Sequence, residues 1–244
     1  MKNKNMLLLL LVSFAFTGCS NKILLKSDFW QKKETAKIGV AMQKYPVCRI
    51  PNEAAGPGLL GALAATAIEN GINHSMNAQL AKFDLSEFSS TKTQFSSKLT
   101  AAGFNTKIIE SIFDIDVYKN FHSNPGNTQE PFFEKDIRSL SEKENIDYLI
   151  LISIGGCGAT KEVGFMKMSL NAFFHPIGQL IDLKTNKVLW RTDFPPEQNS
   201  SPVQGKINSW SGAPADFTEL TKALNTAMEI AQKNLTDDFF ASKP

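Results

Sequence analysis

The sequence is poor in the residues that build metal sites and nucleophilic sites, with three histidines and three cysteines in 244 residues. His74, His122 and His175 lie far apart in the chain. Because zinc sites use clustered His and Cys ligands, no metal is expected. The acidic residues stand at scattered positions, and none of them forms an evident general acid and base pair. We therefore expect no cofactor and no enzyme activity.

An excess of one charge is also absent. The chain has 26 basic and 24 acidic residues. Residues 1–18 contain Lys2 and Lys4 and no acid, so the remainder carries 24 residues of each sign. A nucleic-acid interface needs clustered positive charge, so no nucleic-acid partner is expected. The composition, with 42 % hydrophobic and 20 % charged residues, is that of a globular domain.

The one long apolar run is too short to cross a membrane. Met6–Phe16 is interrupted only by Ser13, whereas a transmembrane helix needs about 20 apolar residues. Basic residues precede this run, and the small residue Gly18 follows it. A positive start, a short apolar stretch and a small residue before the cut are the parts of an export signal.

The four residues Phe16-Thr17-Gly18-Cys19 resemble the lipobox of bacterial lipoproteins, with Phe16 where Leu is usual. The resemblance implies cleavage before Cys19 and fatty acids such as palmitate on that cysteine. It divides the chain into a signal peptide (1–18), a lipidated tether that partly docks (19–36) and a domain (37–240). Ser20 favours the outer membrane by the same resemblance. The alternative is an ordinary secreted protein with a chance cysteine at the cut.

The two remaining cysteines, Cys48 and Cys157, are an even pair for an oxidising compartment. They could form a disulfide or remain as two buried thiols. The glycine-rich stretch 155–158 around Cys157 is expected as a turn after a strand, with an anion cradle as the alternative. The sharpest enzyme hypothesis is a hydrolase in which Cys157 is the nucleophile and His175 the base.

The apolar spacing predicts one α/β domain (α+β mixed), in which helices pack against a single mixed sheet. The expected order is β-α-α-β-α-β-β-β-β-α. The run 146–154 is nearly continuously apolar, which predicts a central strand covered on both faces. Strands are expected at 37–43, 104–109, 146–154, 163–174, 178–183 and 187–194, and helices at 59–83, 86–102, 132–144 and 216–240.

The segment Gly178–Trp190 predicts a hairpin about the turn Lys184-Thr185-Asn186. Together with the lipobox and the strand order, it resembles a group of bacterial outer-membrane lipoproteins. That group includes the curli-secretion-channel lipoprotein, peptidoglycan-synthase activators and lipoproteins with a TolB-amino-terminal-like domain. The resemblance implies a non-catalytic protein on the periplasmic face of the outer membrane that contacts other envelope proteins. An alternative implied by the same group is a subunit of an oligomeric secretion channel.

Two long loops are the expected partner surfaces, because long loops in compact domains are often functional. They are 114–131 and 195–214, and Trp210 in the second loop is a candidate anchor for a partner. Asp237-Asp238 is expected to be a solvated helix end. Partner identity and oligomeric state do not follow from these patterns.

Overall fold

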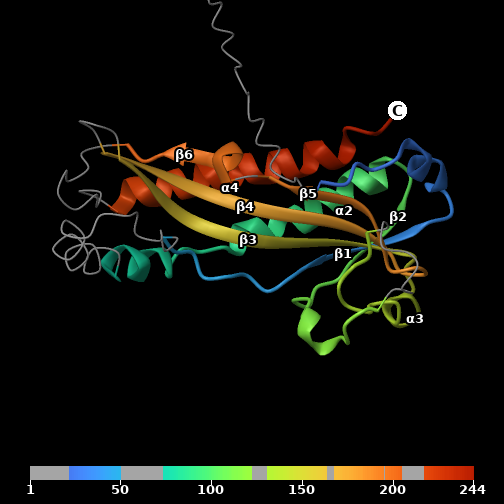
Figure 1. The fold of residues 1–244 in the computed structure, drawn as a ribbon. Helices are drawn as coiled ribbons and strands as arrows, with labels where there is room; N and C mark the ends of the chain where they lie inside the picture. Colours follow the sequence, from blue (N-terminus) through green and yellow to red (C-terminus); the bar gives the residue numbers. More distant parts are fainter. Residues whose placement is uncertain (1–21, 51–73, 123–130, 164–167, 195, 205–216) are drawn as a thin grey trace, which may run out of the picture.

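The computed structural model describes residues 22–50, 74–122, 131–163, 168–194, 196–204 and 217–244 (Figure 1). Within them the chain forms one mixed sheet in the order β2-β1-β3-β4-β5, and a short strand, β6, also pairs with β4. Mixed α/β architecture with a single sheet is thus confirmed. The strands are β1 (Lys37–Met42), β2 (Asn105–Ile108), β3 (Tyr148–Val163), β4 (Met168–Asp182), β5 (Lys187–Asp193) and β6 (Ser200–Pro202).

The central strand β3 is buried on both faces, as its apolar run predicts. β1 pairs in parallel with both β2 and β3, while β3, β4 and β5 are joined as antiparallel neighbours. Successive side chains of a strand point to opposite faces. Leu149 and Leu151 accordingly belong to one hydrophobic cluster, and Ile150 and Ile152 belong to the other.

Two helices, α2 (Ser90–Ala101) and α4 (Phe217–Phe240), contact the same sheet and share one hydrophobic cluster (Figure 1). A short 3-10 helix, η2 (Ser86–Ser89), leads into α2. Both helices confirm the predicted spans. The expected stripe of α4 faces the core, and its buried members include Leu220, Leu224, Ala227, Met228, Ala231 and Leu235.

The segment 22–36, expected as a tether, packs on the domain. It contains a short 3-10 helix, η1 (Ser27–Lys32), whose Phe29 and Trp30 are buried. Phe29 stacks on Phe104 with ring centroids 5.2 Å apart, and Trp30 lies edge-on to Phe239 at 5.8 Å. These rings belong to the cluster between the sheet and α4, so the folded body includes residues well before β1.

The glycine-rich stretch 155–158 is part of β3 rather than the expected turn. β3 continues through it to Val163 with a register shift between Ile154 and Gly156, and the two strands expected at 163–174 and 178–183 form the single long strand β4. A second segment lies against β3 at Gly158, where Arg49 N donates to Cys157 O at 2.9 Å. Gly158 has a φ of +152°, and any Cβ there would overlap the carbonyl of Arg49.

The prediction of a helix at 132–144 is wrong for residues 132–139. Only α3 (Leu140–Glu144) is helical. Phe133 and Ile137 have helical spacing, four positions apart, but their backbone groups bond to Asn186 in the turn between β4 and β5. Most of the helix expected at 59–83 lies outside the described residues; its last part, residues 74–80, is helical.

Candidate functional site: a polar groove at the end of the sheet

A groove of about 1000 Å³ lies where β1 and β3 begin and β4 ends. Its walls come from η1, from the loop after the short 3-10 helix η3 (Ile115–Val117), from the segment before α3 and from the β4–β5 turn. The groove is open to solvent and lined by four basic and four acidic residues. These are Lys32, Lys119, Arg138 and Lys184, and Asp136, Glu142, Asp147 and Asp182.

One wall is formed by Lys32 and Tyr148. Lys32 Nζ donates to the Tyr148 hydroxyl at 2.9 Å and lies 5.3 Å from the centre of the tyrosine ring. This hydrogen bond is the main reason that the pKa of Lys32 is raised above its usual value. Tyr148 in turn lies edge-on to the buried Phe29, with ring centroids 5.6 Å apart. The core therefore holds this cation at the groove.

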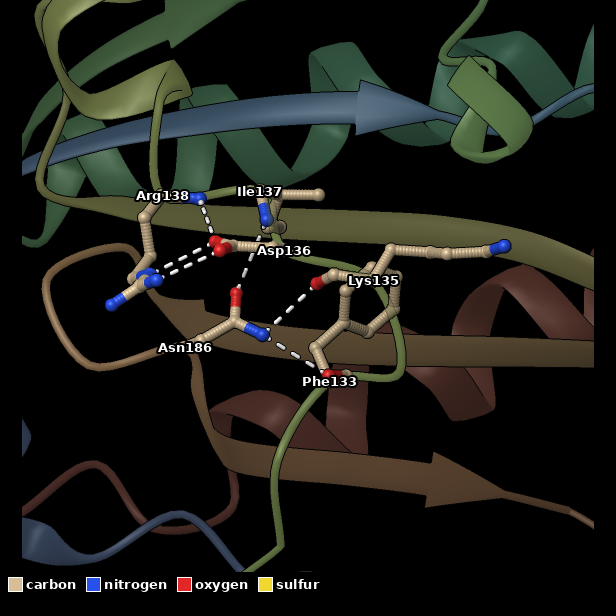
Figure 2. Close-up of polar contacts among 6 residues, drawn as sticks. All are labelled: Phe133, Lys135, Asp136, Ile137, Arg138 and Asn186. Carbon is tan, nitrogen blue, oxygen red and sulfur yellow. Dashed lines mark hydrogen bonds and ion pairs between the residues drawn. The ribbon is translucent and has the colours of Figure 1, made fainter. Parts of the chain in front are cut away.

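Another wall carries a bidentate ion pair between Asp136 and Arg138 (Figure 2). Arg138 Nε donates to Asp136 Oδ1 at 2.8 Å, and Nη2 donates to Oδ2 at 2.7 Å. The guanidinium hydrogen bonds hold the pKa of the Asp136 carboxyl below its usual value. The same guanidinium lies 5.4 Å from the ring centre of Phe121. Both charges are therefore already paired within the fold.

The position of that wall depends on Asn186, which is fully buried (Figure 2). Its Nδ2 donates to Phe133 O at 3.0 Å and to Lys135 O at 2.9 Å, and its Oδ1 accepts from Ile137 N at 3.4 Å. Asn186 has a φ of +64° in the β4–β5 turn, a conformation that asparagine tolerates better than most residues. This one side chain joins the turn to the irregular segment before α3.

Two more groove carboxylates bind backbone amides. Asp182 Oδ1 accepts from Lys184 N at 2.8 Å, which closes the β4–β5 turn. Asp147 Oδ2 accepts from Lys37 N at 2.8 Å, which joins the entrances of β1 and β3. These acids are therefore used to hold loops and strand ends. The groove presents balanced charge and rigid polar edges, features that suit contact with a polar protein surface.

The residues singled out from the sequence do not meet at this groove. Cys19 and Trp210 lie outside the described residues, as does part of each expected contact loop. Cys48 and Cys157 are both buried and are joined in a disulfide between the segment before residue 51 and β3. A disulfide sulfur is not a thiolate, so the hydrolase hypothesis has no free nucleophile at Cys157 in this structure.

The apolar side chains in the strand expected at 163–174 contribute to the core. Leu170, Ala172 and Phe174 of β4 are buried in the cluster beneath α4. Phe174 contacts the ring of Phe88, with centroids 4.8 Å apart. These side chains therefore face the protein core. Among the described residues, no helix combines the length and the apolar character needed to span a bilayer.

The patterns in the sequence did not predict the groove. Its residues come from segments separated by up to about a hundred and fifty positions, such as Lys32 and Lys184. Asn186 was noted only as a turn residue. The available signal was that an asparagine in a two-strand turn tolerates positive φ, but nothing local indicates that its amide also binds the segment 133–137.

Comparisons with known proteins show low similarity. No protein-family model matches the chain, and no curated protein matches it. Among solved structures, it is similar to the lipoprotein GNA1162 from Neisseria meningitidis, with 16 % identity over 82 % of this chain and 99 % of that chain, and a TM-score of 0.30. It is also similar to the hypothetical protein CT253 from Chlamydia trachomatis, with 13 % identity over 84 % and 99 % of the two chains and a TM-score of 0.32.

A third similar structure is a neuraminyllactose-binding hemagglutinin homolog from Helicobacter pylori, with 10 % identity over 85 % of this chain and 87 % of that chain, and a TM-score of 0.32. All three scores are too low to carry an argument about activity or partners. The groove and the sequence have to support any functional conclusion.

Proposed function

We propose that the protein is a lipid-anchored bacterial envelope module that works by contact with another envelope protein and not by catalysis. The observation that carries the proposal is that carboxylates lining the groove are already hydrogen-bonded within the fold. The carboxylates at Asp136, Asp147 and Asp182 already accept bonds from a guanidinium or from backbone amides. Groups committed in this way shape a recognition surface and are poorly placed to exchange protons with a substrate.

The anchor in this proposal is fatty acid on Cys19, with cleavage after Gly18. At least two acyl chains are needed for stable attachment to a bilayer. Ser20 favours the outer membrane by resemblance, and the proposed orientation is toward the periplasm, as in the curli-channel and synthase-activator group. The buried disulfide between Cys48 and Cys157 supports an oxidising compartment of this kind.

The anchor is tested by mass spectrometry of protein purified from membranes of its own host. The expected N-terminal peptide begins at Cys19 and carries acyl chains. A Cys19→Ala variant is expected to lose the lipid and to leave the membrane fraction. An unmodified Cys19, or a Cys19→Ala variant that stays in the membrane, contradicts the anchor.

The contact surface is tested by placing a photo-crosslinking amino acid at Glu142, which is exposed in the groove. The matched control is Glu229, which is exposed on α4 outside the groove. Irradiation of living cells is expected to give a discrete adduct from position 142 and none from position 229. Equal labelling from both positions contradicts a groove-specific partner.

Trp210 remains a second contact candidate from the sequence. A Trp210→Ala variant is expected to reduce partner capture if the loop 195–214 takes part in the same interface. Capture that is unchanged by this substitution removes Trp210 from the proposal and leaves the groove as the contact surface.

A further inference from the structure

The first described residues are held firmly on the fold. Lys22 forms an ion pair with Asp238 of α4. Ile23 pairs with Arg191 of β5 through two backbone bonds, Ile23 N to Arg191 O at 2.8 Å and Arg191 N to Ile23 O at 2.9 Å. Figure 1 shows this blue segment passing beside α4 on its way to η1. The segment from Lys22 to η1 is therefore fixed on the fold.

Within this fixed segment one apolar side chain points outward. Leu24 is 70 % exposed, whereas Leu25 is 6 % exposed and packs in the core, and Ile23 packs against the other hydrophobic cluster. Lys26, two positions further, is exposed. An exposed leucine in a segment pinned by backbone pairing is not needed to hold that segment in place. Its outward position leaves the Leu24 side chain available for a contact outside the folded domain.

The short length of chain between Cys19 and Lys22 indicates which surface Leu24 can reach. Three residue steps separate Cys19 from Lys22, and an extended chain spans at most about 3.3–3.6 Å per residue. If lipid holds Cys19, Lys22 lies within about 11 Å of the lipidated cysteine. This step rests on the proposed lipid anchor. With so short a connection, the surface around Leu24 has to lie next to the bilayer.

We propose that Leu24 and Lys26 form a second contact with the membrane, on the leaflet that holds the lipid of Cys19. Leu24 enters the boundary between headgroups and acyl chains, and the Lys26 ammonium meets the lipid phosphates. Lys22 holds the segment by its pairing with Asp238. The domain then has a fixed orientation on the membrane instead of moving freely on a flexible tether. The outer edge of β5 and the end of α4 lie on the membrane side.

The test uses the full lipidated protein, purified from its host and reconstituted in vesicles of phosphatidylethanolamine and phosphatidylglycerol with brominated acyl chains. A Leu24→Cys variant carries a bimane fluorophore. The matched control is Val117→Cys, because Val117 is also aliphatic and is 72 % exposed, in a segment whose neighbours Ile115 and Tyr118 pack on the other cluster. Cys48 and Cys157 are joined in a disulfide and the sulfur of Cys19 is blocked by its lipid in the lipidated protein, so only the new thiol takes the label.

The bromolipids are expected to quench the label at position 24 several-fold more than the label at position 117. Aqueous iodide is expected to show the opposite order. Equal quenching at the two positions, or no bromolipid quenching at position 24, overturns the proposal. The acyl mass of Cys19 is measured on the same preparation. A lipidated protein without quenching at position 24 defeats only the second contact, whereas a protein without acyl mass defeats the anchor itself.

Discussion

The indole Nε1 of Trp190 donates a 3.0 Å hydrogen bond to Asp238 Oδ2, although the two residues are 48 positions apart. Trp190 is fully buried on β5, and its ring also lies over Gly178 of β4. The side chain of Asp238 is only 11 % exposed and also binds Lys22. The expectation of a solvated helix end therefore holds for the exposed Asp237 and is wrong for Asp238, which links β5, α4 and the N-terminal segment.

Replacing Asp238 with Leu is expected to destabilise the protein by about 1–3 kcal/mol, because the buried indole N–H loses its acceptor. Asp238→Asn keeps an acceptor oxygen and removes only the charge that faces Lys22, so its effect is expected to be smaller. Urea unfolding of the two variants measures the difference. Asp238→Leu as stable as Asp238→Asn would mean that the indole bond contributes little.

Removing the disulfide by a Cys48→Ser, Cys157→Ser double substitution is expected to cost a few kcal/mol. The cysteines are separated by 109 positions, and the chain-entropy model gives about 4.7 kcal/mol for a loop of that order. Dithiothreitol is expected to lower the unfolding midpoint of the wild type and to leave that of the double variant unchanged. Equal midpoints for the oxidised wild type and the double variant would contradict this contribution.

Asn186→Gly is expected to destabilise the protein by at least about 1–3 kcal/mol. Glycine accepts the positive φ, but three backbone groups of the segment 133–137 lose their partners, and two of these hydrogen bonds are buried. The matched control is Asn145→Gly, since Asn145 also has positive φ (54°) but is exposed. The control is expected to be near neutral. Similar midpoints for the two variants in urea would remove the structural role given to the Asn186 amide.

Gly158→Ala is expected to cost about 2–4 kcal/mol, because the added methyl group overlaps the carbonyl of Arg49 and the backbone has to shift. Gly156→Ala is the control in the same strand. A Cβ there would lie 3.6 Å from the Phe173 ring, which is ordinary contact. Thermal unfolding monitored by circular dichroism compares the two, and an equally small shift for both would show that the segment at Arg49 adapts freely.

The Asp136–Arg138 pair predicts a pH-dependent contribution to stability. The pKa of Asp136 is lowered in the fold, so its contribution is present above the unfolded pKa of about 3.9 and is lost as the pH falls through the lower folded value. Asp136→Asn is therefore expected to be destabilised by less than about 1 kcal/mol near neutral pH. The difference from wild type should vanish in strong acid. Urea midpoints over this pH range check the trend, and a constant difference would contradict it.

Local patterns in the sequence determined which elements bury one face in the core and which bury both faces. The stripe of α4 follows from apolar residues three and four positions apart, and the central position of β3 follows from its unbroken apolar run. The turn at Lys184-Thr185-Asn186 follows from its composition. These features could be predicted because the repeat of a helix or strand decides locally which side chains share a face.

Only the tertiary structure decided the contacts between distant segments. Arg49 lies against Gly158 of β3, Asn186 binds the irregular segment 133–137, and Asp238 binds both Trp190 and Lys22. The groove arises from the same kind of meeting, since its walls come from separate parts of the chain. Composition and spacing cannot specify such sites, because backbone groups and buried polar atoms accept whichever partner the packing of the whole chain brings within hydrogen-bonding distance.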